Sequence, residues 1–538
     1  MRVRAALLLA CLTGCAHTEA APPPPRPMQS VPDAGPAVEP RADLDALRAE
    51  AKKLLETQSE LYWKNWTTGA PIDVAATYQG HDALFSVHTI AAVQAAEAKE
   101  PDLVKRRALT DFELYLAGEH IASAVAPLSD QVSNIEGAAT VSFDGAEVPY
   151  RNIEPTLANE PDHARRVALQ DAAAPVLARL TPLLAQKQAE SEKQVRALGY
   201  PSYEALAARM RDADLDALAK QAEAVLSGTE ALYTKAMADA VHRELSLDLK
   251  DMRRADIPRF FHSSAVQSAF PADQMMPRFT QLLAEMGIDL AKLKITIDAR
   301  DLPHKNPRAV CFPIVVPTDV RLSIKPAGGV DDYAQLYHEG GHALHFASTT
   351  TPVWEFQQLG NATVTESYAF LFEDRLEDPA YLAELGMTGE LLKGYVRSAA
   401  VKKLYMLRRY AAKVLFEEAW HGPNPLHGDA LKAKYRELLT RAYGFPLTDV
   451  DADRYLVDHD DFFYSADYLR AWFLAAQLDA DLAKKFGATW WHSPKAGETL
   501  RALWASGNQL TAEEVAQQLG DAGLDEKPLL ARLQQRLQ

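Results

Sequence analysis

The sequence predicts a mainly α-helical protein with a small β-sheet, and three observations support this fold class. Apolar residues recur at spacings of three and four, as at Leu44, Leu47, Ala51 and Leu54. Alanine-, leucine- and charge-rich stretches, which favour helices, continue almost to the end of the chain. Clear alternation of apolar and polar residues is confined to 309–325. No repeat of fixed period is evident, so a solenoid is not indicated.

A further amphipathic helix is predicted from the spacing of five apolar residues: Leu404, Leu407, Ala411, Val414 and Leu415. The clearest strand signal is the alternation of Val320, Leu322 and Ile324 with polar residues, which is the pattern of a half-buried strand. Ala309 to Val316 is a second candidate strand. It contains Pro313, which suits an edge strand or a bend. Phe143-Asp144-Gly145 indicates a small hairpin or a loop near residue 145.

Composition limits the class of protein. The chain has 538 residues, of which 48% are hydrophobic and 24% charged, so it can bury a sizeable core. Its formal net charge of −16 disfavours a nucleic-acid partner, because phosphates would be repelled. Two of the three cysteines lie at Cys11 and Cys15, which leaves Cys311 unpaired in the body of the chain and excludes a disulfide scaffold.

The N-terminus has the features of a targeting segment. Arg2 and Arg4 precede a short apolar run that ends in Leu12-Thr13-Gly14-Cys15, which resembles the lipobox of bacterial lipoproteins. The resemblance implies a signal peptide over 1–14 and a lipid on Cys15, anchored in the bacterial cell envelope. Ala16, in place of aspartate, favours the outer membrane by similarity to bacterial sorting rules. An ordinary signal peptide and an uncleaved apolar start remain alternatives.

The segment after Cys15 is rich in proline. Eight prolines fall between Ala21 and Pro40, and such a stretch is expected to be an extended tether over 15–42. No linker is evident after Asp43, so a single large domain is expected over 43–538.

The motif that carries chemistry is His338-Glu339-Gly340-Gly341-His342. On a helix, an offset of four residues is about 400°, so both imidazoles leave from nearly the same face and are able to share one zinc ion. Glu339 lies beside the first histidine and is angled away from it, as a general base acting on a zinc-bound water requires. The two glycines are poor helix formers, which indicates that backbone or substrate packs tightly against that turn. The alternative is two histidines on a helix surface without a metal.

A third ligand is predicted at Glu366, 24 residues after His342. It lies in an apolar stretch that has the character of a buried helix, where a carboxylate needs a partner such as a metal. Glu373 is seven residues further on, on the same helix face. It is either a hydrogen-bond partner of a ligand histidine or a solvated residue. Three protein ligands leave one position open for water, as in catalytic zinc sites.

A third group of polar residues, His459, Tyr464 and Tyr468, lies near the C-terminus. Phenol and imidazole groups aimed at a peptide carbonyl are able to stabilise the negative charge that develops on its oxygen during attack by water. Tyrosines on a helix also commonly belong to the core, which is the alternative for these two.

Taken together, the motif, Glu366 and the spacing of His459, Tyr464 and Tyr468 resemble the thimet oligopeptidase and oligoendopeptidase F family of zinc peptidases. The resemblance is strong over 300–375, moderate over 455–475 and faint around Gly199-Tyr200-Pro201-Ser202-Tyr203. It implies a helical, two-lobed body with a deep channel that admits short peptides, and one zinc ion held by His338, His342 and Glu366.

The same resemblance implies roles for the remaining residues. Glu339 would be the base, the strand at Ala309 to Val316 would pair with the substrate backbone, and His459, Tyr464 and Tyr468 would bind substrate or steady the tetrahedral intermediate. The chain departs from the family at Ala471, where a further tyrosine is common, so the oxyanion donor is left open.

Three functions are compatible with these residues. The leading one is a zinc-dependent endopeptidase for short peptides, expected to be a monomer. The second is a dipeptidyl carboxypeptidase of the angiotensin-converting-enzyme type, which would release C-terminal dipeptides. The third is a non-catalytic lipoprotein that binds zinc or peptides; the retained Glu339 argues against it, because zinc binding does not require that residue.

Overall fold

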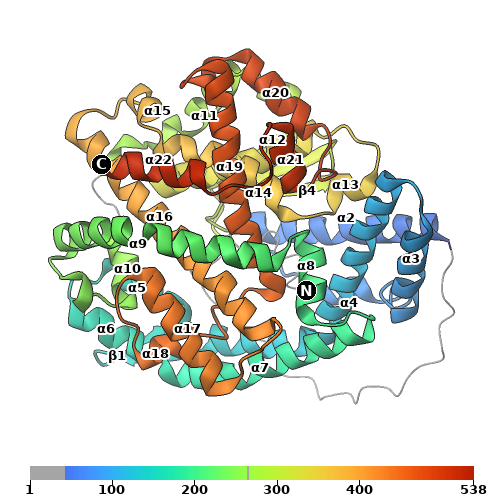
Figure 1. Cartoon of the computed structure of the whole chain (residues 1–538), viewed down its shortest axis with the longest axis horizontal. Coiled ribbons are helices and arrows are strands. Elements are labelled where there is room, and N and C mark those ends of the chain that lie inside the picture. The colour runs from blue at the N-terminus through green and yellow to red at the C-terminus, as the bar shows by residue number, and fades with distance from the viewer. Residues whose placement is uncertain (1–42, 263–265) are drawn as a thin grey trace.

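The computed structural model describes residues 43–262 and 266–538, and most of them are helical (Figure 1). The helices before the main sheet are α2 (Leu44–Thr68), α3 (Val87–Lys99), α4 (Leu103–Ala138), α5 (Ile153–Asn159), α6 (His163–Asp171), α7 (Ala174–Ala197), α8 (Tyr203–Arg211), α9 (Leu215–Leu245), α10 (Ile257–Phe260) and α11 (Met275–Glu285). Those after it are α12 (Val330–Ser348), α13 (Trp354–Gln358), α14 (Ala362–Glu373), α15 (Pro379–Glu384), α16 (Gly389–His421), α17 (Gly428–Tyr443), α18 (Asp449–Ala452), α19 (Tyr464–Phe486), α20 (Pro494–Trp504), α21 (Ala512–Gln518) and α22 (Lys527–Leu537).

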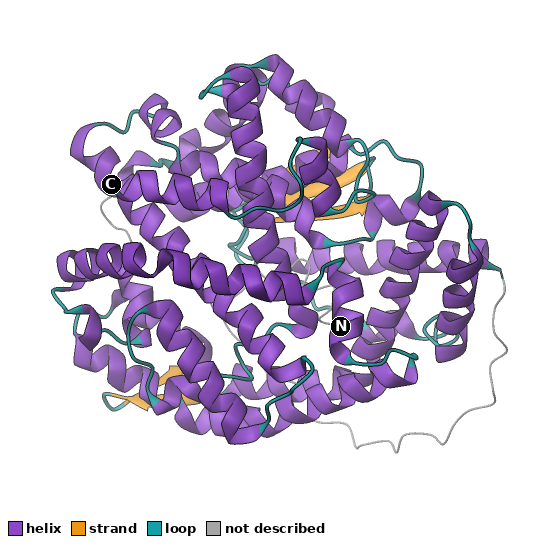
Figure 2. Ribbon diagram, in the orientation of Figure 1, coloured by secondary structure: helices purple, strands orange, loops and turns teal. Residues whose placement is uncertain are grey.

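Two small sheets lie far apart in the molecule (Figure 2). One is the hairpin of β1 (Thr140–Phe143) and β2 (Ala146–Pro149). The other has the order β3-β5-β4, formed by β3 (Ile295–Asp298), β4 (Val310–Val315) and β5 (Asp319–Ser323). In it β3 is parallel to β5 and β4 is antiparallel to it, so β4 is an edge strand. Cys311 of β4 and Val320 of β5 pack with Ala343 of α12 (Val330–Ser348).

Several local predictions are confirmed. The helical pattern predicted from Asp43 onward is α2, in which Leu47, Ala51 and Leu54 are buried, and the Asp43 side chain caps its start by accepting from the N–H groups of Asp45 and Ala46. The predicted helix around 404–415 is part of α16. The register between β4 and β5 shifts at Pro313, as expected for a proline that lacks a ladder donor. The hairpin turn at Asp144-Gly145 has φ of 52° and 76°, which explains its aspartate and glycine.

The sheet contains one strand more than the sequence pattern predicted. β3 is only four residues long and half-exposed, so it has too little alternation to be recognised. The buried strand is β5, which lies between β3 and β4, and its Val320 and Leu322 are covered.

Two large groups of packed apolar side chains make up most of the core. The first is built mainly on α2, α4, α8, α9, α16 and α17, and the second on α11, α12, α15, α20 and α21. Helices α14 and α19 contribute to both groups: Phe370 belongs to the first and Phe372 to the second. Helix α14 carries Glu366, and helix α19 carries Tyr464 and Tyr468. These candidate site residues are therefore held between the two cores.

Some predictions fall outside the described residues. The lipobox at Cys15 and the proline-rich segment lie within 1–42. Within the described ranges, no helix combines the length and the apolar character needed to cross a membrane. Cys311 is buried with a free thiol, as its position in the sequence indicated.

Candidate metal centre and its cavity

The two glycines of the motif allow α12 to approach its neighbours closely. A Cβ on Gly341 would lie 2.6 Å from the Cα of Ala369 and 2.9 Å from the carbonyl oxygen of Tyr368, both on the backbone of α14. A Cβ on Gly340 would lie 2.3 Å from the Phe279 ring of α11. The predicted tight packing is thus against backbone at Gly341 and against an aromatic ring at Gly340, and the contact at Gly341 brings the motif helix against the helix that carries Glu366.

The three predicted ligands converge at this contact. Oε2 of Glu366 lies 3.3 Å from Nε2 of His338 and 3.8 Å from Nε2 of His342. Tetrahedral zinc with bonds of about 2.0–2.1 Å separates its ligand atoms by about 3.4 Å, so this spacing fits one ion. Oε2 of Glu366 is also buried without a hydrogen-bond partner, which is costly unless a cation completes the site. His338, His342 and Glu366 therefore fit a zinc ion.

Each histidine is oriented by a partner at its other nitrogen. Nδ1 of His338 lies 2.9 Å from Oε2 of Glu373, and Nδ1 of His342 lies 2.8 Å from Oγ1 of Thr365. These bonds turn both Nε2 atoms toward Glu366 and, for His338, favour the tautomer with the proton on Nδ1. Of the two roles considered for Glu373, the structure supports the hydrogen-bond partner. Burial lowers the pKa of His342 well below its usual value, so its ring is neutral, as a ligand must be.

Replacing Glu373 by alanine is expected to weaken zinc binding by roughly 10- to 100-fold, because His338 loses the carboxylate that fixes its ring. Competition with a zinc chelator would measure this directly. Glu498→Ala, on an exposed position of α20, is the matched control and should bind zinc as the unaltered protein does. Equal affinity in the Glu373 variant would remove the orienting role assigned to this residue.

Glu339 is held by the neighbouring strand. Its Oε2 accepts a hydrogen bond of 2.8 Å from the backbone N–H of Cys311, an outward-pointing group of the edge strand β4. Burial raises the pKa of Glu339 to about 7, with the nearby Glu366 adding to the rise and His338 and the Cys311 N–H opposing it. The sheet thus fixes one carboxylate oxygen of Glu339, which leaves the other to bind a water molecule. A pKa of about 7 suits a general base near neutral pH.

A cavity of about 640 Å³ opens beside the three-ligand cluster. Glu339, His342, Glu366 and Tyr468 all line it. Its other walls come from α2, α4, the end of α8, the strand β4 and the segment Asn508 to Thr511. The candidate metal site is therefore accessible from a space large enough for several residues of an extended peptide.

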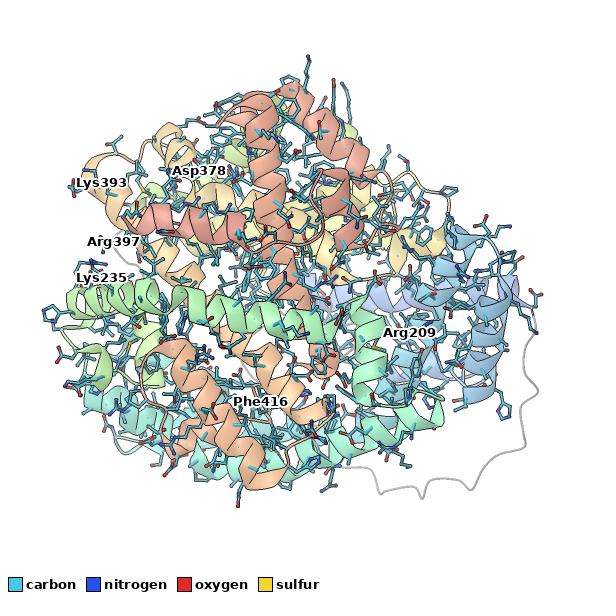
Figure 3. The ribbon with its side chains drawn as sticks, viewed as in Figure 1. Arg209, Lys235, Asp378, Lys393, Arg397 and Phe416 are labelled. Carbon is cyan, nitrogen blue, oxygen red and sulfur yellow. The ribbon has the colours of Figure 1, made fainter. Side chains whose placement is uncertain are left out.

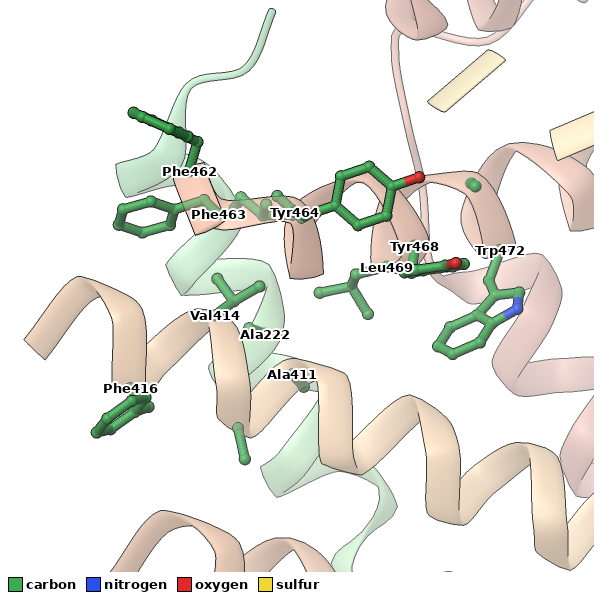
Figure 4. Close-up of a cluster of buried hydrophobic side chains, with 14 of the residues drawn as sticks. Ala222, Ala411, Val414, Phe416, Phe462, Phe463, Tyr464, Tyr468, Leu469 and Trp472 are labelled. Atoms are coloured by element: carbon green, nitrogen blue, oxygen red, sulfur yellow. The ribbon is translucent and has the colours of Figure 1, made fainter. Parts of the chain in front are cut away.

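Two of the C-terminal residues lie at the site. The hydroxyl of Tyr464 is 3.4 Å from Oε1 of Glu366, to which it donates, and Tyr468 lines the cavity. Tyr464, Tyr468 and Trp472 follow one another at every fourth position of α19, so their rings lie along one side of this helix (Figure 4). Both tyrosines are also core residues, so the two interpretations of them are compatible.

The turn before α19 is strained. Phe462 and Phe463 adopt left-handed backbone conformations, with φ of 53° and 55°, which cost bulky residues about 1–3 kcal/mol each. Helix α8 offsets this cost at Phe462: the Tyr203 hydroxyl accepts its N–H at 2.6 Å, and Nε of Arg211 donates to its carbonyl at 2.8 Å. The strained turn sets where α19 begins and thereby directs Tyr464 toward Glu366.

His459 lies elsewhere. Its ring packs on Trp420 at 4.8 Å and lies 5.9 Å from that of His421, and burial lowers its pKa to about 4. Among the described residues that line the cavity, His459 does not occur. Of the three C-terminal candidates, the structure brings Tyr464 and Tyr468 to the site and leaves His459 in a separate cluster.

Two residues that sequence reasoning missed help to assemble the site. Thr365 orients His342, and Asp467 joins α19 to the start of α14 by accepting hydrogen bonds from Asn361 at 3.1 Å and Thr363 at 2.8 Å. Arg211 pairs with the same aspartate. Asp467 could have been noticed in the sequence, because it is an acidic residue in an apolar helix and lies between the two candidate tyrosines.

Known families give no direct assignment: neither a model of a protein family nor any curated protein matches this sequence.

Proposed function

We propose that this protein is a zinc-dependent endopeptidase that hydrolyses short peptides. The observation that carries the proposal is the buried, unpartnered Oε2 of Glu366 beside the Nε2 atoms of His338 and His342, next to Glu339 and an open cavity. Two histidines and a glutamate leave a coordination position open, which is the ligand set of hydrolytic zinc sites.

Zinc bound by these residues would polarise a water molecule and a substrate carbonyl. Glu339 is placed to take the proton from that water, because its carboxylate is held by Cys311 at the cavity wall. It would then pass the proton to the leaving amine. The hydroxyl of Tyr468, which lines the cavity, and that of Tyr464, beside Glu366, are the candidates for donation to the carbonyl oxygen as its negative charge develops.

The edge strand β4 supports a peptide as the substrate. Val310, Cys311, Phe312 and Pro313 of this edge strand line the cavity, so an extended peptide in the cavity would lie alongside the strand. Two cores with the candidate site between them agree with the two-lobed, channelled body that the oligopeptidase resemblance implies. We therefore propose the oligopeptidase type of zinc peptidase, attached by a lipid at Cys15 to the outer membrane of a bacterial cell envelope.

The experiment that tests the function combines metal analysis with digestion of a mixed peptide library. The expected result is about one zinc ion per chain and cleavage at internal bonds, which is lost on chelation and restored by zinc. Stepwise release of C-terminal dipeptides would instead identify a dipeptidyl carboxypeptidase. Zinc binding without any cleavage would leave a zinc- or peptide-binding lipoprotein.

A further inference from the structure

The cavity contains an acidic residue that the proposed chemistry does not use. Asp111, on α4, lines the same space as Glu339 and Glu366. Its Oδ2 is covered from solvent and has no hydrogen-bond partner among the described residues. Burial raises the pKa of this carboxyl well above its usual range, with Arg107 opposing and Asp212 adding to the rise. Burial therefore favours the neutral form of this carboxyl, and a cation bound beside it would favour the ionised form.

Three of the four arginines that line the cavity do not supply that cation, because they pair with other carboxylates. Arg107 forms two hydrogen bonds to Glu514 and a third to the carbonyl oxygen of Gln509. Arg209 (Figure 3) donates two bonds to Glu97 from the end of α8.

Two further arginines line the cavity. Arg211 is held by Asp467. Arg106 has no ion-pair partner among the described residues, but it is exposed, so solvent and salt screen its charge.

We propose that Asp111 forms a subsite for a positively charged group of the substrate, so that the enzyme prefers peptides that place a basic side chain or a free amino terminus in this cavity. The inference rests on the proposed peptidase function. An ammonium or guanidinium group fits because it donates several hydrogen bonds and restores the charge balance of a shielded carboxylate. The neighbouring Asp212, on the same cavity wall, adds to the negative potential.

Because Asp111 lacks a partner, a binding role and a structural role predict opposite effects of its replacement on stability. A carboxylate that stabilises the fold would be paired, whereas this one is expected to destabilise it. Asp111→Asn is therefore expected to keep or raise the melting temperature while it weakens selection for cationic peptides. A structural role would instead lower the melting temperature.

The test uses one peptide in four forms: with lysine or norleucine near the cleaved bond, each with a free or an acetylated amino terminus. For the unaltered zinc-loaded protein, kcat/KM should be roughly 10- to 100-fold higher for a cationic form than for the acetylated norleucine form. Comparing the acetylated lysine peptide with the norleucine peptide that has a free amino terminus identifies which cation is recognised. In Asp111→Asn this ratio should fall close to one, and in Asp130→Asn, an exposed position on the same helix, it should not change.

Calorimetric binding of the same peptides to the zinc-loaded protein separates the two proposals. Cleavage of all four forms at similar rates would overturn the subsite and leave the peptidase intact. Tighter binding of cationic forms, lost in Asp111→Asn but without any cleavage, would support the subsite and overturn the peptidase. Neither binding nor cleavage would overturn both.

Discussion

Glu339→Gln is expected to retain about one zinc ion per chain and to lose peptide turnover by roughly 10²- to 10⁴-fold. Glutamine keeps the shape of the side chain, and its amide oxygen is able to accept the N–H of Cys311, so β4 and α12 should stay together. It is not basic enough to take a proton from water. Metal content and kcat on a cleaved peptide would measure the two effects separately.

The matched control for this variant is Glu498→Gln, which makes the same chemical change at an exposed position of α20. It should keep both zinc and activity. Turnover by Glu339→Gln at the unaltered rate would contradict the base role. Loss of zinc in that variant would show that Glu339 contributes to metal binding instead.

Gly341→Ala is expected to destabilise the protein by about 1–3 kcal/mol or more and to lower its zinc affinity. Helix propensity alone predicts that the variant would be more stable, because alanine stabilises a helix interior by about 1 kcal/mol more than glycine does. The added methyl group would meet the backbone of α14 at Ala369 and Tyr368, which has no side-chain rotamer to change. The two helices would separate, and Glu366 would move away from both histidines.

Denaturant unfolding and chelator competition would measure these two losses. Gly228→Ala in α9 is the control, because nothing lies within 4 Å of the added Cβ and the position is exposed. It should gain about 0.5–1 kcal/mol. If both substitutions stabilised the protein equally, the close approach of α12 and α14 would not be the reason for the glycine.

Much of the candidate metal cluster was predictable because it depends on local geometry. The four-residue spacing of His338 and His342 fixes both side chains to one helix face, whatever the rest of the fold does. Glu366 was identifiable as a carboxylate in a stretch too apolar to be solvated. The amphipathic stripe of α2, the edge position of the strand with Pro313 and the hairpin at Asp144-Gly145 are likewise properties of short segments.

Other parts of the site depend on contacts between distant segments. The residues that orient the ligands and α19 were only partly foreseen, because a hydrogen-bond partner such as Thr365 or Arg211 has no spacing rule that marks it. His459 shares a short segment with Tyr464, yet the left-handed turn at Phe462 and Phe463 separates them, so the segment serves two different clusters. The sequence pattern had grouped all three.

The sequence by itself determined the helical class, the His338–His342 pair, the adjacent Glu339 and the distant Glu366, because helical periodicity, the spacing within the motif and the cost of burying charge are properties of short segments. Only the tertiary structure decided why Gly341 is glycine, which partner holds each histidine, and that Asp111 lines the same cavity as Glu366. These facts depend on how α4, α12, α14 and α19 pack. Packing joins residues hundreds of positions apart, which no local pattern records.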